Sequence, residues 1–124
     1  METKHLEGKG IADYDSKNDL LFFKVKDRDY VKSIETDNFV VDIDSEDFIV
    51  GVQIFEAATF LNLKKEALIK ITKWHLEASI HENRIEVRLL FEVKIRNKII
   101  EKNPIIMQTI QEGLPNSELI CVTA

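Results

Sequence analysis

The sequence has little of what marks a secreted, membrane-spanning or disordered protein. Its 124 residues include two prolines, four glycines and one cysteine. Disordered segments are enriched in proline and glycine, and one cysteine cannot form an internal disulfide. No stretch approaches the roughly 20 apolar residues of a membrane-spanning helix. We therefore expect a single folded domain over residues 1–124, with Cys121 as a packed, reduced thiol.

The net charge and the polar N-terminal residues indicate where in the cell the protein resides and which partners it can bind. The formal net charge is −5, with −7 in residues 1–62 and +2 in residues 63–124. A negative chain disfavours nucleic acid and anionic membranes, because lysine and arginine supply most of that affinity. The first dozen residues lack the apolar stretch of a secretory signal. We expect a cytoplasmic protein whose residues 1–10 form a flexible tail.

Strict alternation of apolar and polar residues marks two strands in the second half, at 72–80 and 84–96. A tight turn at Glu82-Asn83 joins them and matches the faces of both strands. The predicted apolar pairs are Ile80–Ile85, Ala78–Val87, Leu76–Leu89 and Trp74–Phe91. A slip of one residue would set apolar against polar side chains, so the register is strongly specified.

The alternation continues into a third strand, which makes residues 72–124 an antiparallel meander. A turn at Asn97-Lys98 predicts the pairs Lys94–Glu101, Leu89–Ile106 and Leu90–Ile105. Pro104 interrupts this strand, and because proline has no N–H to donate, the strand must lie at an edge or bulge there. Leu119–Thr123 predicts a short final strand.

The first half predicts two hairpins followed by helix. The expected strands flank polar turns, at 11–15 with 20–26 and at 39–43 with 48–55. Residues 56–61 and 63–71 favour helix, with Asn62 as a cap, and we place the helical segment 62–71 across a sheet face. The predicted fold class is α+β, with a mostly antiparallel sheet.

Residues 11–61 resemble the uncharacterised family known as domain of unknown function 2283. The resemblance rests on a Tyr-Asp then Asp-x-Leu hairpin, an aspartate-bearing strand and a Gly-x-x-Ile-x-x-Ala junction. The matching positions are Tyr14, Asp15, Asp19, Leu21, Asp42, Asp44, Gly51, Ile54 and Ala57. The family offers no catalytic residues to carry over. The resemblance implies an antitoxin-like partner of another small protein as one alternative function.

The acidic turn after the third predicted strand is a candidate metal site. Asp42, Asp44, Glu46 and Asp47 offer the oxygen ligands that hard cations prefer. The turn lacks the glycine and the distal glutamate of a calcium loop, so a solvated turn is the competing interpretation. Asp42 and Asp44 are therefore the metal or small-ligand candidates.

Other reactive side chains predict no catalytic residue and no cofactor. His75 and His81 share a strand face about 20 Å apart, too far to hold one metal ion. The glycines are scattered, and the apolar neighbours of Cys121 argue against a reactive thiol. Acidic residues interrupt a basic set that contains Lys94, Arg96, Lys98 and Lys102. Nucleic-acid binding is therefore disfavoured, although an acid/base pair assembled from distant strands is invisible to sequence.

Leu90, Ile105 and Met107 interrupt the charged outer face of the meander and predict an interface. The competing interpretation is that the N-terminal hairpins cover them. Our leading hypothesis is a non-enzymatic module that self-associates as a dimer. The alternatives are a small-ligand or metal-binding protein that uses the acidic hairpin, and the antitoxin-like partner.

Overall fold

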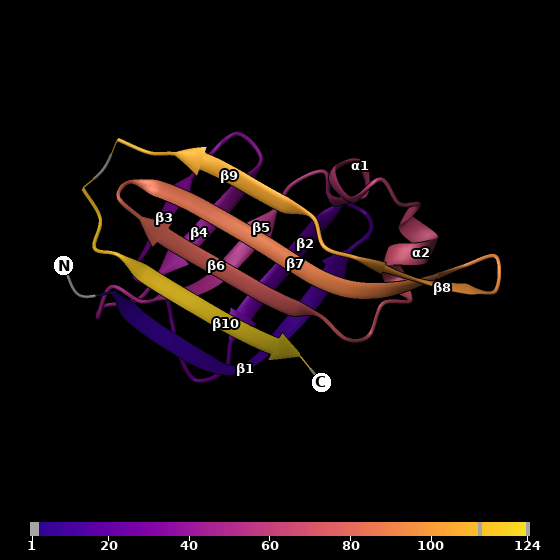
Figure 1. The fold of residues 1–124 in the computed structure, drawn as a ribbon, viewed down its shortest axis with the longest axis horizontal. Coiled ribbons are helices and arrows are strands. Elements are labelled where there is room, and N and C mark those ends of the chain that lie inside the picture. The colour runs from indigo at the N-terminus through magenta and orange to yellow at the C-terminus, as the bar shows by residue number, and fades with distance from the viewer. Residues whose placement is uncertain (1–2, 112, 124) are drawn as a thin grey trace.

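In a computed structural model, which describes residues 3–111 and 113–123, ten strands form one mixed sheet (Figure 1). The strands are β1 Lys4–Asp15, β2 Leu20–Val25, β3 Lys32–Glu35, β4 Phe39–Ile43, β5 Ile49–Ile54, β6 His75–His81, β7 Arg84–Ile95, β8 Lys98–Lys102, β9 Ile105–Thr109 and β10 Ser117–Thr123. Two five-residue helices, α1 Ala57–Leu61 and α2 Lys65–Ile69, connect β5 to β6. No helix of the described residues is long and apolar enough to cross a membrane.

The sheet is continuous but folds into two layers. Its order is β3-β4-β5-β2-β1-β10-β6-β7-β8, and β9 pairs with β7. Residues 4–10 of β1 pair in parallel with β10, whereas residues 10–15 pair antiparallel with β2. In Figure 1 the strands of the N-terminal half cross behind those of the C-terminal half. The long strand β1 therefore carries the sheet from one layer to the other.

Gly10 is the residue at which the pairing of β1 changes from β10 to β2. A Cβ atom there would overlap the Cys121 sulfur and would lie 2.9 Å from the Lys24 carbonyl oxygen. Cys121 is buried, as predicted, and burial raises the pKa of its thiol. Only glycine allows β2 and β10 to approach β1 this closely from its two sides.

The core lies between the two layers, and aromatic contacts connect one layer to the other. Trp74 meets Phe23 of the opposite layer edge-on, with ring centroids 5.6 Å apart, and packs on Phe91 at 4.6 Å. Aromatic pairs of this geometry stabilise a core beyond the area that they bury. The largest fully buried side chains come from both layers and include Phe23, Phe39, Leu21, Ile54, Leu76, Ile85 and Leu89.

The β6–β7 hairpin confirms the predicted register, including Ile80 opposite Ile85 and Leu76 opposite Leu89. Its turn residues, Glu82 and Asn83, both have positive φ, at 49° and 63°. Two consecutive residues with positive φ characterise the tight type I′ turn, whose twist matches the flanking strands.

The predicted second turn was wrong by one residue. Positive φ occurs at Arg96 (50°) and Asn97 (66°), not at Asn97-Lys98. Both hairpins thus place asparagine second in the turn, where left-handed backbone costs it little. The register shifts by two residues, so the observed pairs are Lys94–Ile99, Glu92–Glu101, Arg88–Ile105 and Val87–Ile106. A shift of two preserves the faces, which leaves Ile105 and Met107 on the outside.

Pro104 has the predicted effect on the third strand. It separates β8 from β9, and its carbonyl accepts the Leu89 N–H at 3.0 Å. Both pieces lie along the same edge of β7. The final strand was placed only as an extension of the meander, but β10 crosses back to lie between β1 and β6.

Three further predictions for local structure need correction. The expected flexible tail is wrong from Lys4 onward, because Lys4–Gly10 pair with β10. His5 lies between Glu7 and Glu118, whose hydrogen bonds raise its pKa. The helix expected at 62–71 is shorter, and Asn62 ends α1 in the left-handed conformation. Both helices sit at one end of the layers rather than across a face (Figure 1), so the fold is mostly β.

Candidate functional site

Asp44 holds the acidic turn together. One carboxylate oxygen accepts the N–H groups of Glu46 and Phe48 at 2.9 and 3.0 Å. The other oxygen lies 2.7 Å from an Arg28 nitrogen, and Arg28 also stacks over the Phe48 ring at 4.8 Å. These contacts engage both carboxylate oxygens of Asp44 and give it a structural role.

Asp44→Asn should therefore lower stability in a pH-dependent way. Burial raises the pKa of Asp44, but hydrogen bonds from Phe48, Arg28 and Glu46 lower it more, so the pKa lies below its ordinary value. A depressed pKa stabilises the fold above the unfolded-state pKa of about 3.9, and this contribution is lost as pH falls through the folded value. We expect a loss of about 2 kcal/mol in unfolding free energy at pH 7.

Urea unfolding at pH 7 and pH 2.5 measures this difference. The difference between wild type and Asp44→Asn should shrink at the lower pH, because the wild-type carboxyl group takes up a proton in the unfolded state there. Asp29→Asn is the control, because the Asp29 side chain is 92% exposed and its ion pair with Lys24 contributes little. An Asp44→Asn cost that is the same at both pH values would show that the carboxylate charge is not involved.

Asp42 has a different environment from Asp44. It projects from β4 away from the core, yet only 3% of its surface is exposed. Its oxygens accept the Ser33 hydroxyl at 2.6 Å and, weakly, the Gln53 amide at 3.4 Å. In the part of the chain that the structure describes, no three His, Cys, Asp or Glu side chains gather closely enough to hold a metal ion. The metal site at Asp42 and Asp44 stays a prediction without a third ligand.

The other family-like positions hold the first hairpin against α1. The Tyr14 hydroxyl donates to Asp19 at 2.6 Å, and the same Asp19 oxygen accepts the Ala58 N–H at 2.9 Å. Burial and the Asp19 carboxylate raise the pKa of Tyr14. Leu21, Ile54 and Ala57 are fully buried. These positions therefore account for the fold of the N-terminal half rather than for a reactive centre.

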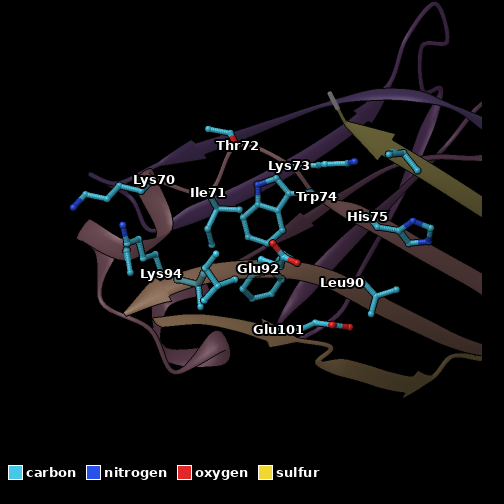
Figure 2. Close-up of a pocket in the computed structure, with 15 residues that line it drawn as sticks. Lys70, Ile71, Thr72, Lys73, Trp74, His75, Leu90, Glu92, Lys94 and Glu101 are labelled. Carbon is cyan, nitrogen blue, oxygen red and sulfur yellow. The ribbon is translucent and has the colours of Figure 1, made fainter. Parts of the chain in front are cut away.

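A groove of about 680 Å³ lies beside β7. β6 begins at His75, opposite Leu90, so the end of β7 has a neighbouring strand on one side only. The groove occupies the place where the preceding chain diverges from β7. Figure 2 shows Lys70 and Lys94 at one end, His75 and Leu90 at the other, and Trp74 between them. Sequence reasoning missed this groove, because its walls come from segments that are distant in the chain.

The structure separates the two candidate histidines. His75 begins β6 beside the groove, and its ring nitrogen is 3.7 Å from Glu77. His81 ends the same strand opposite Arg84 and is exposed. The structure thus places the two histidines at opposite ends of one strand face.

The predicted interface residues lie on the outer face of the C-terminal layer. Ile105 and Met107 are 47% and 57% exposed on β9, while Leu90 is half-buried on β7. The register places Ile105 beside Arg88 and Met107 beside Glu86. The N-terminal layer does not cover this face, because it packs against the other one. In Figure 1, β9 lies at the border of the front layer.

The comparisons with known proteins agree with the family resemblance. Residues 12–57 match the model of the family described as "Protein of unknown function (DUF2283)". A Methanosarcina mazei protein with the printed name "Putative hypoxanthine phosphoribosyltransferase" is 33% identical over 90 residues, which cover 73% of each chain. An uncharacterised protein of Methanocaldococcus jannaschii is 26% identical over 87% of this chain and 94% of its own. No solved structure matches the chain. The chain therefore belongs to one family with the Methanosarcina mazei protein, and its residues 12–57 carry the domain of unknown function 2283.

Proposed function

We propose that this protein is a non-enzymatic interaction module that forms a dimer through the free edge of β9. The observation that carries the proposal is the composition of that edge. Ile105–Thr109 contains no charged residue, and Ile105 and Met107 are exposed. At the opposite end of the sheet, β3 has only four residues, with Lys32 and Glu35 exposed. Short, charged edges resist pairing with other chains, whereas an apolar edge invites it.

The backbone of β9 presents the groups that strand pairing needs. The Leu89 N–H donates to Pro104, and the Ile110 N–H donates to Asn83, so the even-numbered residues bond towards β7. Backbone groups alternate along a strand. The N–H and C=O groups of Ile105, Met107 and Thr109 therefore point towards the free edge, where no described strand pairs with them.

A twofold axis satisfies these groups in both copies at once. If Ile106 faces Ile106 of a second copy in an antiparallel pair, Ile105 faces the second copy's Met107 on the outer surface. The same surface patch then serves both subunits, as a closed dimer requires. Glu86 and Arg88 flank this apolar centre and form a charged rim. The pairing would join two sheets into one and cover side chains that are exposed in one copy.

Met107→Lys should convert the dimer to a monomer without unfolding it. Each copy would then carry a lysine at the centre of the interface, opposite the apolar Ile105 of the other copy. The dissociation constant of the dimer should rise at least about tenfold. Sedimentation velocity over a range of protein concentrations measures this change. Ile69→Lys is the matched control, because Ile69 is an equally exposed apolar residue on α2, at 59%.

Two outcomes of the sedimentation experiment would contradict the dimer. One is a wild-type protein that remains monomeric at high concentration. The other is a dimer that survives Met107→Lys intact. A stoichiometric second protein, retained when the wild type is isolated gently from its own cells in place of a second copy, would also contradict self-association and would favour the antitoxin-like alternative.

The groove beside β7 supports a second candidate function, the binding of a small anionic ligand. Its volume of about 680 Å³ lies within the usual range for ligand pockets. Lys70, Lys73 and Lys94 line it together with Glu92 and Glu101, and none of the three lysines takes part in the ion pairs of the described residues. The Methanosarcina protein is named as a phosphoribosyltransferase, and a phosphoribosyl group is anionic. Titration calorimetry should then detect binding of hypoxanthine and of a phosphoribosyl donor. If neither compound gives a heat of binding, this candidate function is wrong.

A further inference from the structure

A second, smaller cavity lies on the outer side of the N-terminal layer. The chain that leaves β2 must cross β5 and β4 to reach β3, because those strands lie between them in the sheet. Beneath this crossing segment is a cavity of about 180 Å³. Its walls are formed by Phe22, Lys24, Arg28, Asp29, Tyr30, Asp42, Val50 and Gly51. All of these residues fall inside the family-matched range 12–57.

Four charged side chains, Lys24, Arg28, Asp29 and Asp42, line this cavity. Lys24 pairs with Asp29 at 3.0 Å, and Arg28 pairs with Asp44 at 2.7 Å. Asp42 remains, and the ion pairs of the described residues do not include it. It is 3% exposed, and its hydrogen-bonding partners among the described residues are the neutral Ser33 and Gln53. Buried carboxylates in proteins are normally compensated by a cation.

Gly51 keeps the space beside this carboxylate open. A Cβ atom at residue 51 would lie 3.0 Å from the Asp42 Oδ2 atom and 2.9 Å from the Phe23 carbonyl oxygen. Oδ2 is also the less engaged oxygen, since the 3.4 Å contact with Gln53 is its one hydrogen bond among the described residues. The cavity therefore has a weakly engaged acceptor in its wall.

The shape and chemistry of the cavity favour an organic cation over a metal ion. The volume is roughly that of six liquid water molecules at about 30 Å³ each. Phe22 and Tyr30 are among its lining residues, and aromatic faces attract ammonium groups. A metal ion would need further oxygen or nitrogen ligands, and the described residues provide no cluster of three. We propose that this cavity binds a small organic molecule through a primary ammonium group, with Asp42 as its counter-ion.

The first test uses the wild-type protein and two probes of equal size. n-Propylammonium chloride should raise the melting temperature above the value in sodium chloride of equal ionic strength, because a ligand of the native state stabilises it. 1-Propanol has the same length without the charge and should give no rise. Equal effects of the two probes, or no effect of the ammonium beyond that of sodium, would overturn the proposal. A larger effect of Mg²⁺ or Ca²⁺ would also overturn it and point to a metal site.

Two variants test the assignment to particular residues. Asp42→Asn keeps the shape and removes the charge, so the affinity for propylammonium in calorimetry should fall at least about tenfold. Gly51→Ala should reduce affinity by filling the cavity while Asp42 remains. Lys17→Ala, at an exposed turn outside the cavity, is the control and should bind as wild type does. Unchanged affinity in Asp42→Asn would overturn the proposal, and the wild-type comparison of the two probes decides it if that variant fails to fold.

Discussion

Gly10→Ala should lower the free energy of unfolding by about 2–3 kcal/mol, although it adds a single methyl group. The added carbon would overlap the Cys121 sulfur and would press on the Lys24 carbonyl at 2.9 Å. Because β1 is paired on both sides around this residue, neither neighbour can withdraw without breaking backbone hydrogen bonds. Equilibrium urea unfolding measures the loss.

Gly113→Ala is the matched control for this variant. A Cβ atom at Gly113 meets nothing within 4 Å, so the substitution should be neutral or slightly stabilising. Combining Gly10→Ala with Cys121→Ala should cost less than the sum of the single variants, since removing the sulfur relieves part of the overlap. If Gly10→Ala is as stable as Gly113→Ala, β1 does not run between β2 and β10 as described.

Trp74→Ala should cost about 3–5 kcal/mol, the usual range for removing a large aromatic side chain from a core. Trp74 is 4% exposed and contacts Phe23 of one layer and Phe91 of the other. Its loss would leave a cavity between the two layers that backbone movement cannot fill. The melting temperature and the urea midpoint should both fall.

A double-variant cycle separates the contact between layers from simple loss of volume. Phe23→Ala and Trp74→Ala should show a coupling of about 0.5–1.5 kcal/mol, which is typical of edge-on aromatic pairs. Ile99→Ala is the surface control, because Ile99 is 71% exposed. Strict additivity of Phe23→Ala and Trp74→Ala would mean that the two rings do not meet.

The hairpins were predictable from sequence because their information is local. In β6 and β7 the alternating pattern and a two-residue turn specify one register, and the structure has it. The next turn was displaced by one residue, because the pattern in 96–98 is polar throughout and does not distinguish the two positions. Turn geometry, rather than hydrophobic pattern, decided the outcome there.

The arrangement of the two halves was not predictable, because it depends on contacts between distant segments. The N-terminal residues 4–10 are too polar to resemble a core strand, yet they pair with β10 from the other end of the chain. Parallel pairing of this kind leaves no turn signal in the sequence. The one sequence feature that marks this pairing is Gly10. The reason for a glycine there becomes visible only in the structure, where a Cβ atom at residue 10 would overlap the Cys121 sulfur.

The candidate sites were predictable only in part. The apolar residues Ile105 and Met107 stood out because their neighbours on that face are charged. Asp42 and Asp44 looked alike in sequence, but Arg28 pairs with Asp44, whereas Asp42 is buried and has no ion pair among the described residues. That difference depends on the segment that crosses β5 and β4, and its path follows from the strand order.

Residue-resolved amide hydrogen exchange at high protein concentration tests the pairing of β9 most directly. We predict slow exchange for the outward N–H groups of Ile105, Met107 and Thr109, with exchange accelerating as the protein is diluted towards monomer. The Ile110 N–H, which donates to Asn83 at 2.7 Å within one chain, should stay protected throughout. Fast exchange of the three outward amides at high concentration, with Ile110 still protected, would contradict the β9 interface.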